Sequence, residues 1–115
     1  PYHCYCQKTT RLISEKFNKI KIVTTFQSRF GPEDWLQPYT DKTLEKLPKE
    51  GTKNVLVISP GFASDCVETL EEISIQGKEI FEKNGGENFG FIPCLNDSDD
   101  HINLLEHLIK KNLNE

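Results

Sequence analysis

The feature that most constrains the fold is an alternation of short apolar runs with longer helical patterns. The run KNVLVIS at 53–59 is continuously apolar at its centre, which is typical of a strand covered on both faces of a parallel sheet. Two further runs, IKIVTTFQS at 20–28 and NFGFIPC at 88–94, are also predicted to be strands. Because helical patterns separate these runs, the sequence predicts an α/β fold with helices on both faces of a parallel sheet.

The helical patterns predict four helices, over residues 3–18, 41–50, 65–83 and 99–113. Pro48 is expected to disturb the second helix near its end, and the Asn-Gly-Gly at 84–86 is expected to end the third. Apolar residues at helical spacing mark the inward faces of the first and last helices: Leu12, Ile13 and Phe17, and then Ile102, Leu105, Leu108 and Ile109.

Composition narrows the class of protein. A chain of 115 residues suits one domain, and its net charge of -4 argues against a nucleic-acid partner. No apolar run approaches the roughly 20 residues of a membrane-spanning helix. Neither a G-x-G-x-x-G nor a P-loop motif is present. The chain contains no methionine and begins at PYHCYC, so we expect a piece of a longer protein that is incomplete on its N-terminal side.

The cysteines do not have the spacing of a secreted disulfide framework. Cys66 and Cys94 are expected to be buried free thiols in a reducing compartment. His3, Cys4 and Cys6 could in principle hold a soft metal, although an ordinary terminal segment with free thiols is the favoured interpretation.

A stripe of carboxylates follows the second predicted strand. At about 100° per residue, the helix over 65–83 places a polar set within an arc of roughly 80°: Asp65, Glu68, Glu72, Gln76 and Glu79. The opposite, apolar side is formed by Cys66, Val67, Leu70, Ile73, Gly77, Ile80 and Phe81. Asp65 and Glu68 also fit a capping box, so Asp65 is expected to be a structural cap.

The pattern alone leaves two interpretations of this stripe open. Amphipathic helices usually present their charges to water, and this is the more frequent case. The stripe also follows the C-terminal end of a buried strand, the edge where open α/β sheets bind ligands. Stacked carboxylates there can hold a divalent cation or move protons. Further residues are expected at the same edge: Gln27, Ser28, Arg29, Trp35 and Phe62.

Three long stretches carry a family resemblance: FQSRFGPEDWLQPYTDKTL at 26–44, KNVLVISPGFASDCVETLEEI at 53–73 and FIPCLND at 91–97. They resemble the ferrochelatases, which insert ferrous iron into a porphyrin. The opening PYHCYCQKT also fits, so the resemblance covers nearly the whole chain. It implies that residues 1–115 are a C-terminal chelatase domain, one of two similar Rossmann-like domains with the porphyrin between them. The first strand and a Ser-Ala-His motif would lie upstream.

The resemblance also implies roles for particular residues. Glu68, in the motif D-x-x-E-T-L, would be the catalytic base or a metal ligand, and Glu72 would be a second metal-binding carboxylate. Gln76 stands where some relatives have an acid, which puts a third carboxylate site in doubt. Gln27 and Trp35 match residues near the macrocycle. The other residues expected in the porphyrin cleft are Ser28, Arg29 and Phe62.

The implied function is the insertion of Fe²⁺ into protoporphyrin IX to give protoheme, the last step of heme biosynthesis. Fe²⁺ would be a substrate, no cofactor would be bound permanently, and the ending KKNLNE implies no C-terminal iron–sulfur cluster. A bacterial-type cytoplasmic enzyme is expected, with peripheral membrane contact left open. Without the upstream Ser-Ala-His motif and the N-terminal half, the piece is expected to be inactive. The alternatives are another tetrapyrrole chelatase of the cobaltochelatase type and a non-catalytic α/β binding module.

Overall fold

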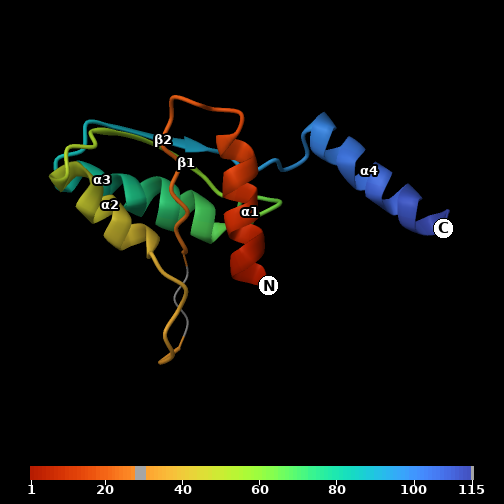
Figure 1. The fold of residues 1–115 in the computed structure, drawn as a ribbon, viewed down its shortest axis with the longest axis horizontal. Helices are drawn as coiled ribbons and strands as arrows, with labels where there is room; N and C mark the ends of the chain where they lie inside the picture. The colour runs from red at the N-terminus through yellow and green to blue at the C-terminus, as the bar shows by residue number, and fades with distance from the viewer. Residues whose placement is uncertain (28–30, 115) are drawn as a thin grey trace.

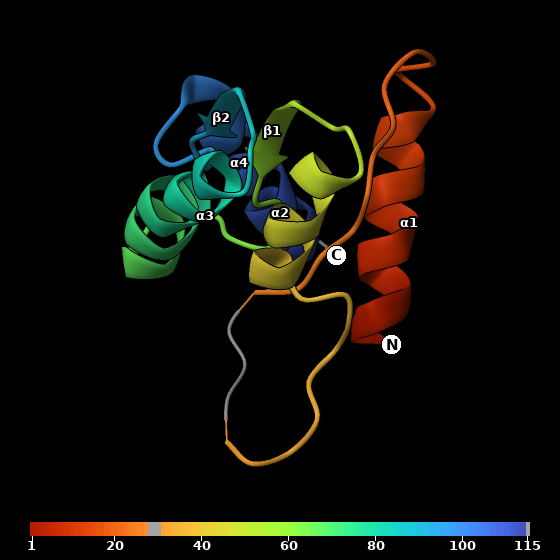
Figure 2. The ribbon, with the colours of Figure 1, turned by 90° about the vertical axis from the view of Figure 1, so that its left-hand side faces the viewer.

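The computed structural model describes residues 1–27 and 31–114. They include a parallel strand pair with three helical segments packed against one another and against the strands, while the last helix extends away (Figures 1 and 2). The elements in chain order are α1 (Tyr2–Ser14), α2 (Thr40–Lys49), β1 (Asn54–Ile58), the π-helix η1 (Glu68–Gly77), α3 (Lys78–Lys83), β2 (Asn88–Ile92) and α4 (Asp99–Leu113). The strands pair in parallel from Asn54↔Asn88 to Ile58↔Ile92. The predicted parallel α/β arrangement is therefore confirmed.

The core lies between the strand pair and the helices η1, α3 and α2. Phe81 is completely buried, and Leu44 and Ile73 are each only 4% exposed. The Phe81 ring lies against that of Phe89 in β2, with 6.1 Å between the ring centroids. A Cβ on Gly77 would lie 3.1 Å from Leu44 Cδ1, so the glycine allows η1 and α2 to approach closely.

The helix predicted over 65–83 begins later and is wound more widely than expected. Residues Glu68–Gly77 form a π-helix, whose i→i+5 hydrogen bonds place more residues in each turn than in an α-helix. The buried positions of η1 recur every four residues, at Thr69, Ile73 and Gly77, and Phe81 of α3 follows four residues later. Val67 and Leu70, which an α-helical period places inward, are 67% and 52% exposed.

The predicted strand at 20–28 is not formed in its described part. Only Phe26 makes a bridge, donating its N–H to Pro38 O (2.9 Å) and accepting from Thr40 N–H (3.1 Å). Ser28 lies outside the described residues. A regular strand needs a neighbour for its ladder, and the sheet within the described residues consists of β1 and β2 alone.

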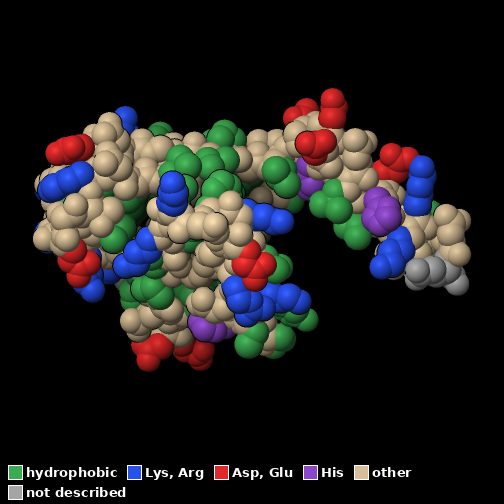
Figure 3. Space-filling view, turned by 45° about the horizontal axis from the view of Figure 1, so that its top comes forward, with side chains coloured by type: hydrophobic (Ala, Val, Ile, Leu, Met, Phe, Trp, Pro, Cys, Tyr) green, Lys and Arg blue, Asp and Glu red, His purple; other side chains and the backbone are tan. Residues whose placement is uncertain are grey.

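Several apolar faces that were predicted to point inward are open. Leu56 and Ile58 of β1 are 67% and 49% exposed, so within the described residues helices cover only one face of the strand pair. The predicted inner residues Leu12 and Phe17 are also exposed, and α1 ends at Ser14 rather than near residue 18. Hydrophobic side chains are visible over the strand pair and along α4 (Figure 3).

The last helix extends away from the other elements (Figure 1). Its residues predicted to point inward are all exposed: Ile102, Leu105, Leu108 and Ile109. Among the described residues of α4, only His101, in the first turn of the helix, is buried. The periodicity of the helix was therefore predicted correctly, but its packing was not.

Replacing Gly86 with alanine should destabilise the fold. A Cβ at Gly86 would lie 2.2 Å from the Phe81 ring, and Phe81 is completely buried, so the ring or the backbone must shift. We expect Gly86→Ala to lower the free energy of unfolding by about 1–3 kcal/mol, measured by urea denaturation of the intact protein. Gly61→Ala is the matched control, because its Cβ would meet only Tyr2 Oη at 3.8 Å. Equal losses in the two variants would contradict this packing.

Candidate functional site

The two carboxylates singled out by the sequence, Glu68 and Glu72, lie four residues apart on η1, and both are half-buried. In a π-helix the wider turn brings residues four apart closer to one line along the helix axis than in an α-helix. Gln76 continues this line and is exposed. The helix follows the loop that leaves the carboxyl end of β1, so the stripe starts near that edge of the strand pair.

Gln27 contacts this acidic stripe directly. Its Nε2 donates a hydrogen bond to Glu72 Oε2 at 3.4 Å, across 45 positions of sequence. Both residues line a hollow of about 280 Å³, whose wall also includes Thr40, Asp41 and Gln76. The structure thus brings together one residue predicted for the porphyrin cleft and one predicted for metal binding.

The other residues predicted for the cleft are not gathered at this hollow. Trp35 is 41% exposed and Phe62 is half-buried, and neither is among the described residues that line the hollow. Ser28 and Arg29 lie outside the described residues. Their assignment to a porphyrin cleft stays a prediction.

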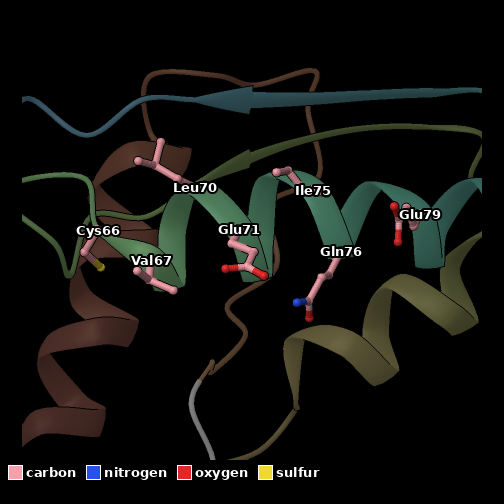
Figure 4. Close-up of a pocket in the computed structure, with 7 residues that line it drawn as sticks. All are labelled: Cys66, Val67, Leu70, Glu71, Ile75, Gln76 and Glu79. Carbon is pink, nitrogen blue, oxygen red and sulfur yellow. The ribbon is translucent and has the colours of Figure 1, made fainter.

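A wider and shallower hollow of about 650 Å³ lies along the outer side of η1 (Figure 4). Its lining mixes apolar side chains with polar ones: Cys66, Val67, Leu70, Glu71, Ile75, Gln76 and Glu79. An α-helical period divides these residues between a buried face and a wet face. The π-helical period instead places them together on the outer side of the helix.

Asp65 does not cap the helix as predicted. The N-cap position is Val67, and no side chain caps η1. The Asp65 carboxylate instead accepts hydrogen bonds from Asn96 Nδ2 (2.8 Å), Thr69 Oγ1 (2.9 Å) and the Cys94 N–H (3.2 Å). The bond from Asn96 contributes most to lowering the pKa of Asp65, which falls to about 2 although partial burial opposes the change.

The sequence pattern did not predict these partners of Asp65. Thr69 is completely buried, yet the α-helical period gave it no role. Asn96 lies in the stretch FIPCLND and has a φ of 49°, in the left-handed region where asparagine is enriched. That preference is the one signal in the sequence that could have singled out Asn96, although it does not identify Asp65 as its partner.

All four cysteines are free thiols, as predicted for Cys66 and Cys94. These two were also predicted to be buried, but they are half-buried. Burial raises the pKa of the Cys94 thiol above its ordinary value, and the nearby Asp65 carboxylate adds to the rise. Such a thiol is a weak nucleophile near neutral pH.

The N-terminal histidine and cysteines do not form a metal site in this structure. The His3 ring stacks on Phe26 with 5.6 Å between the centroids. Among residues 1–27 and 31–114, no group of three or more His, Cys, Asp or Glu side chains is arranged to hold a metal. In the same part of the chain, no helix has the length and apolar character needed to cross a bilayer.

The fold and the site define an α/β protein in which the helix that follows β1 carries two half-buried carboxylates, Glu68 and Glu72. The family model for ferrochelatase matches residues 1–113. Ferrochelatases from Allorhizobium ampelinum and Rhizobium johnstonii are 59% and 57% identical to the chain, each covering 98% of it and each matched over 33% of its own length. A ferrochelatase from Rhizobium meliloti is 57% identical; the match covers 98% of this chain and 34% of the relative. The chain belongs to the ferrochelatase family, and it spans about one third of the length of these curated relatives.

The hydrogen bonds at Asp65 should make stability depend on acid pH. The folded pKa of about 2 lies below the ordinary 3.8, so between these values the unfolded chain binds more protons. The stabilising effect of Asp65 is therefore complete above about pH 4 and is lost as the pH falls toward 2. In the intact protein, Asp65→Asn should melt at a lower temperature than the parent at pH 6, and this gap should narrow below about pH 4.

The exposed neighbour Asp97 provides the control for that experiment. Asp97→Asn should melt close to the parent protein at each pH, measured by circular dichroism over the same range. A gap for Asp65→Asn that stays constant from pH 6 to pH 2 would contradict a stabilising ionised carboxylate at this position.

Proposed function

We propose that this chain is part of an enzyme that inserts Fe²⁺ into protoporphyrin IX to form protoheme, a lyase of heme biosynthesis. Membership of the ferrochelatase family supports the proposal, and so do relatives of that name at 57–59% identity. The observation that carries it is the line of Glu68 and Glu72 on η1, with Gln27 donating to Glu72 at 3.4 Å.

The reaction exchanges two pyrrole protons for one Fe²⁺ ion, so two protons must leave as the metal enters. A carboxylate can accept a proton and can also bind a hard cation, which makes it suitable for either role. In this proposal Glu68 is the base or ligand nearest the macrocycle, and Glu72 is a second carboxylate for metal or protons. The amide of Gln27 can orient the Glu72 carboxylate because it donates to one of its oxygens.

The rest of the site belongs to the part of the protein outside these 115 residues. The cleft would be completed by the N-terminal half, and the upstream Ser-Ala-His motif would provide a histidine opposite Glu68. Trp35 and Phe62, with Gln27, Ser28 and Arg29, would contact the porphyrin. Residues 1–115 alone would bind the substrates incompletely and would not turn over.

Glu68→Gln in the intact protein tests this assignment. The substitution keeps the size of the side chain but removes the charge and the basic oxygen. We expect the rate of iron insertion to fall about 100-fold or more, with an unchanged circular dichroism spectrum. The rate is measured from the absorbance change when Fe²⁺ and protoporphyrin IX are mixed with the enzyme without oxygen.

Glu71→Gln is the matched control. Glu71 lies on the same helix but on its outer side, where it is exposed (Figure 4). We expect this variant to keep turnover within about twofold of the parent, because its charge is solvated. Near-parental turnover by Glu68→Gln, or equal losses in both variants, would remove Glu68 from the proposed chemistry.

A further inference from the structure

Asn96 makes hydrogen bonds through both its backbone and its side chain, and these join the loop before η1, its own loop after β2 and the first turn of α4. Its backbone N–H donates to Ala63 O at 3.0 Å, in the loop between β1 and η1. Its side-chain Nδ2 donates to Cys94 O at 3.0 Å and to Asp65 Oδ2 at 2.8 Å. Its carbonyl oxygen lies 2.6 Å from His101 Nδ1, and since a carbonyl can only accept, the histidine donates.

Asp65 and Asn96 exchange two hydrogen bonds, one donated by each residue. While Asn96 Nδ2 donates to the Asp65 carboxylate, the Asp65 backbone N–H donates to Asn96 Oδ1 at 2.8 Å. The Cys94 N–H donates to the same carboxylate at 3.2 Å. The segment that leads into η1 is thereby tied to the segment that leaves β2. We call Asp65, Thr69, Cys94 and Asn96 the clasp.

Thr69 connects the clasp to the first turn of η1. Its hydroxyl donates to Asp65 Oδ1 at 2.9 Å and accepts the Cys66 N–H at 2.9 Å. The Thr69 side chain is completely buried, so few other rotamers are open to it. Glu68 immediately precedes Thr69 in the chain. The orientation of the Glu68 side chain therefore depends on the first turn of η1, which the hydrogen bonds of the clasp fix.

The other side of the clasp is also fixed. His101 is only 7% exposed, and its backbone N–H donates to Ser98 Oγ at the N-cap of α4. Asn96 itself has a φ of 49°, a conformation that asparagine adopts more readily than most residues. The clasp is thus anchored in a buried histidine and a capped helix rather than in a solvent-exposed loop.

We propose that Asn96, acting through Asp65 and Thr69, is a positioning residue for Glu68 in the metal-insertion reaction. The inference rests on the proposed function, because it assigns to the clasp the alignment of the base or ligand in that reaction. Asn96 does not touch substrate in this proposal. It acts by holding the first turn of η1 in one orientation relative to the strand pair.

Asn96→Ala in the intact protein tests the proposal with two readouts. Without the clasp, kcat for iron insertion should fall about 10- to 100-fold, because small misplacements of a reacting group have effects of this size. The KM for porphyrin should stay within about twofold. Amide hydrogen exchange at the start of η1 should accelerate, while exchange in the β1–β2 ladder should not.

Asn88→Ala is the matched control, because Asn88 is an asparagine at the opposite end of β2. Its Nδ2 also donates to a side chain, Asn54 Oδ1, but it lies outside the clasp. This variant should leave kcat and the exchange of η1 at parental values. If Asn96→Ala fails to fold, the same test uses Thr69→Val, which loses the hydroxyl, against Thr69→Ser, which keeps it and should retain kcat.

The outcomes separate this inference from the proposed function. An intact parent protein without any iron insertion would refute the proposed function and the positioning role with it, whereas faster exchange at η1 would still identify the clasp as an ordering device. With an active parent, parental kcat in the clasp variant would overturn the positioning role whatever the exchange shows. A KM increase with unchanged kcat would also overturn it, because the clasp would then act on binding alone.

Discussion

The π-helical hydrogen bonding of η1 determines which of its residues pack against the core and which face the site. In a π-helical turn, side chains four residues apart share a side of the helix, so Thr69, Ile73 and Gly77 enter the core together. The same spacing places Glu68 and Glu72 along a neighbouring line. An α-helix with this sequence would spread both sets around its axis by about 40° with every four residues. π-Helical turns are rare and are frequently found at functional sites.

Two contacts hold η1 against its surroundings. At its start, the clasp ties the helix to the segment after β2 through the Asp65 carboxylate. At its end, Gly77 allows Leu44 of α2 to approach closely. The position of α2 matters for the site, because the Thr40 N–H at its start donates to Phe26 O, and the next residue, Gln27, donates to Glu72. Core packing and site geometry are thus connected through a few short contacts.

Much of the fold could be predicted from the sequence. The runs at 53–59 and 88–94 became β1 and β2, and the helix expected at 41–50 is Thr40–Lys49. Of the predicted acidic stripe, Glu68 and Glu72 lie on η1, whereas Asp65 precedes the helix and Glu79 lines the outer hollow with Glu71. The π-helical winding was not predicted, because side-chain types reveal polar and apolar faces but not whether the backbone bonds i→i+4 or i→i+5. The predictions of a strand at 20–28 and of an inward face on α4 were wrong for a different reason. Each depends on a partner surface, and local periodicity predicts a face without showing what covers it.

The most direct test of this account is to locate the metal itself. Crystals of the intact protein soaked anaerobically in Fe²⁺ would give anomalous scattering at each ordered iron. We expect iron coordinated by a carboxylate oxygen of Glu68 or Glu72 on η1, and loss of that signal in Glu68→Gln/Glu72→Gln crystals. Ordered iron elsewhere in the protein, with both carboxylates free of metal, would contradict the account.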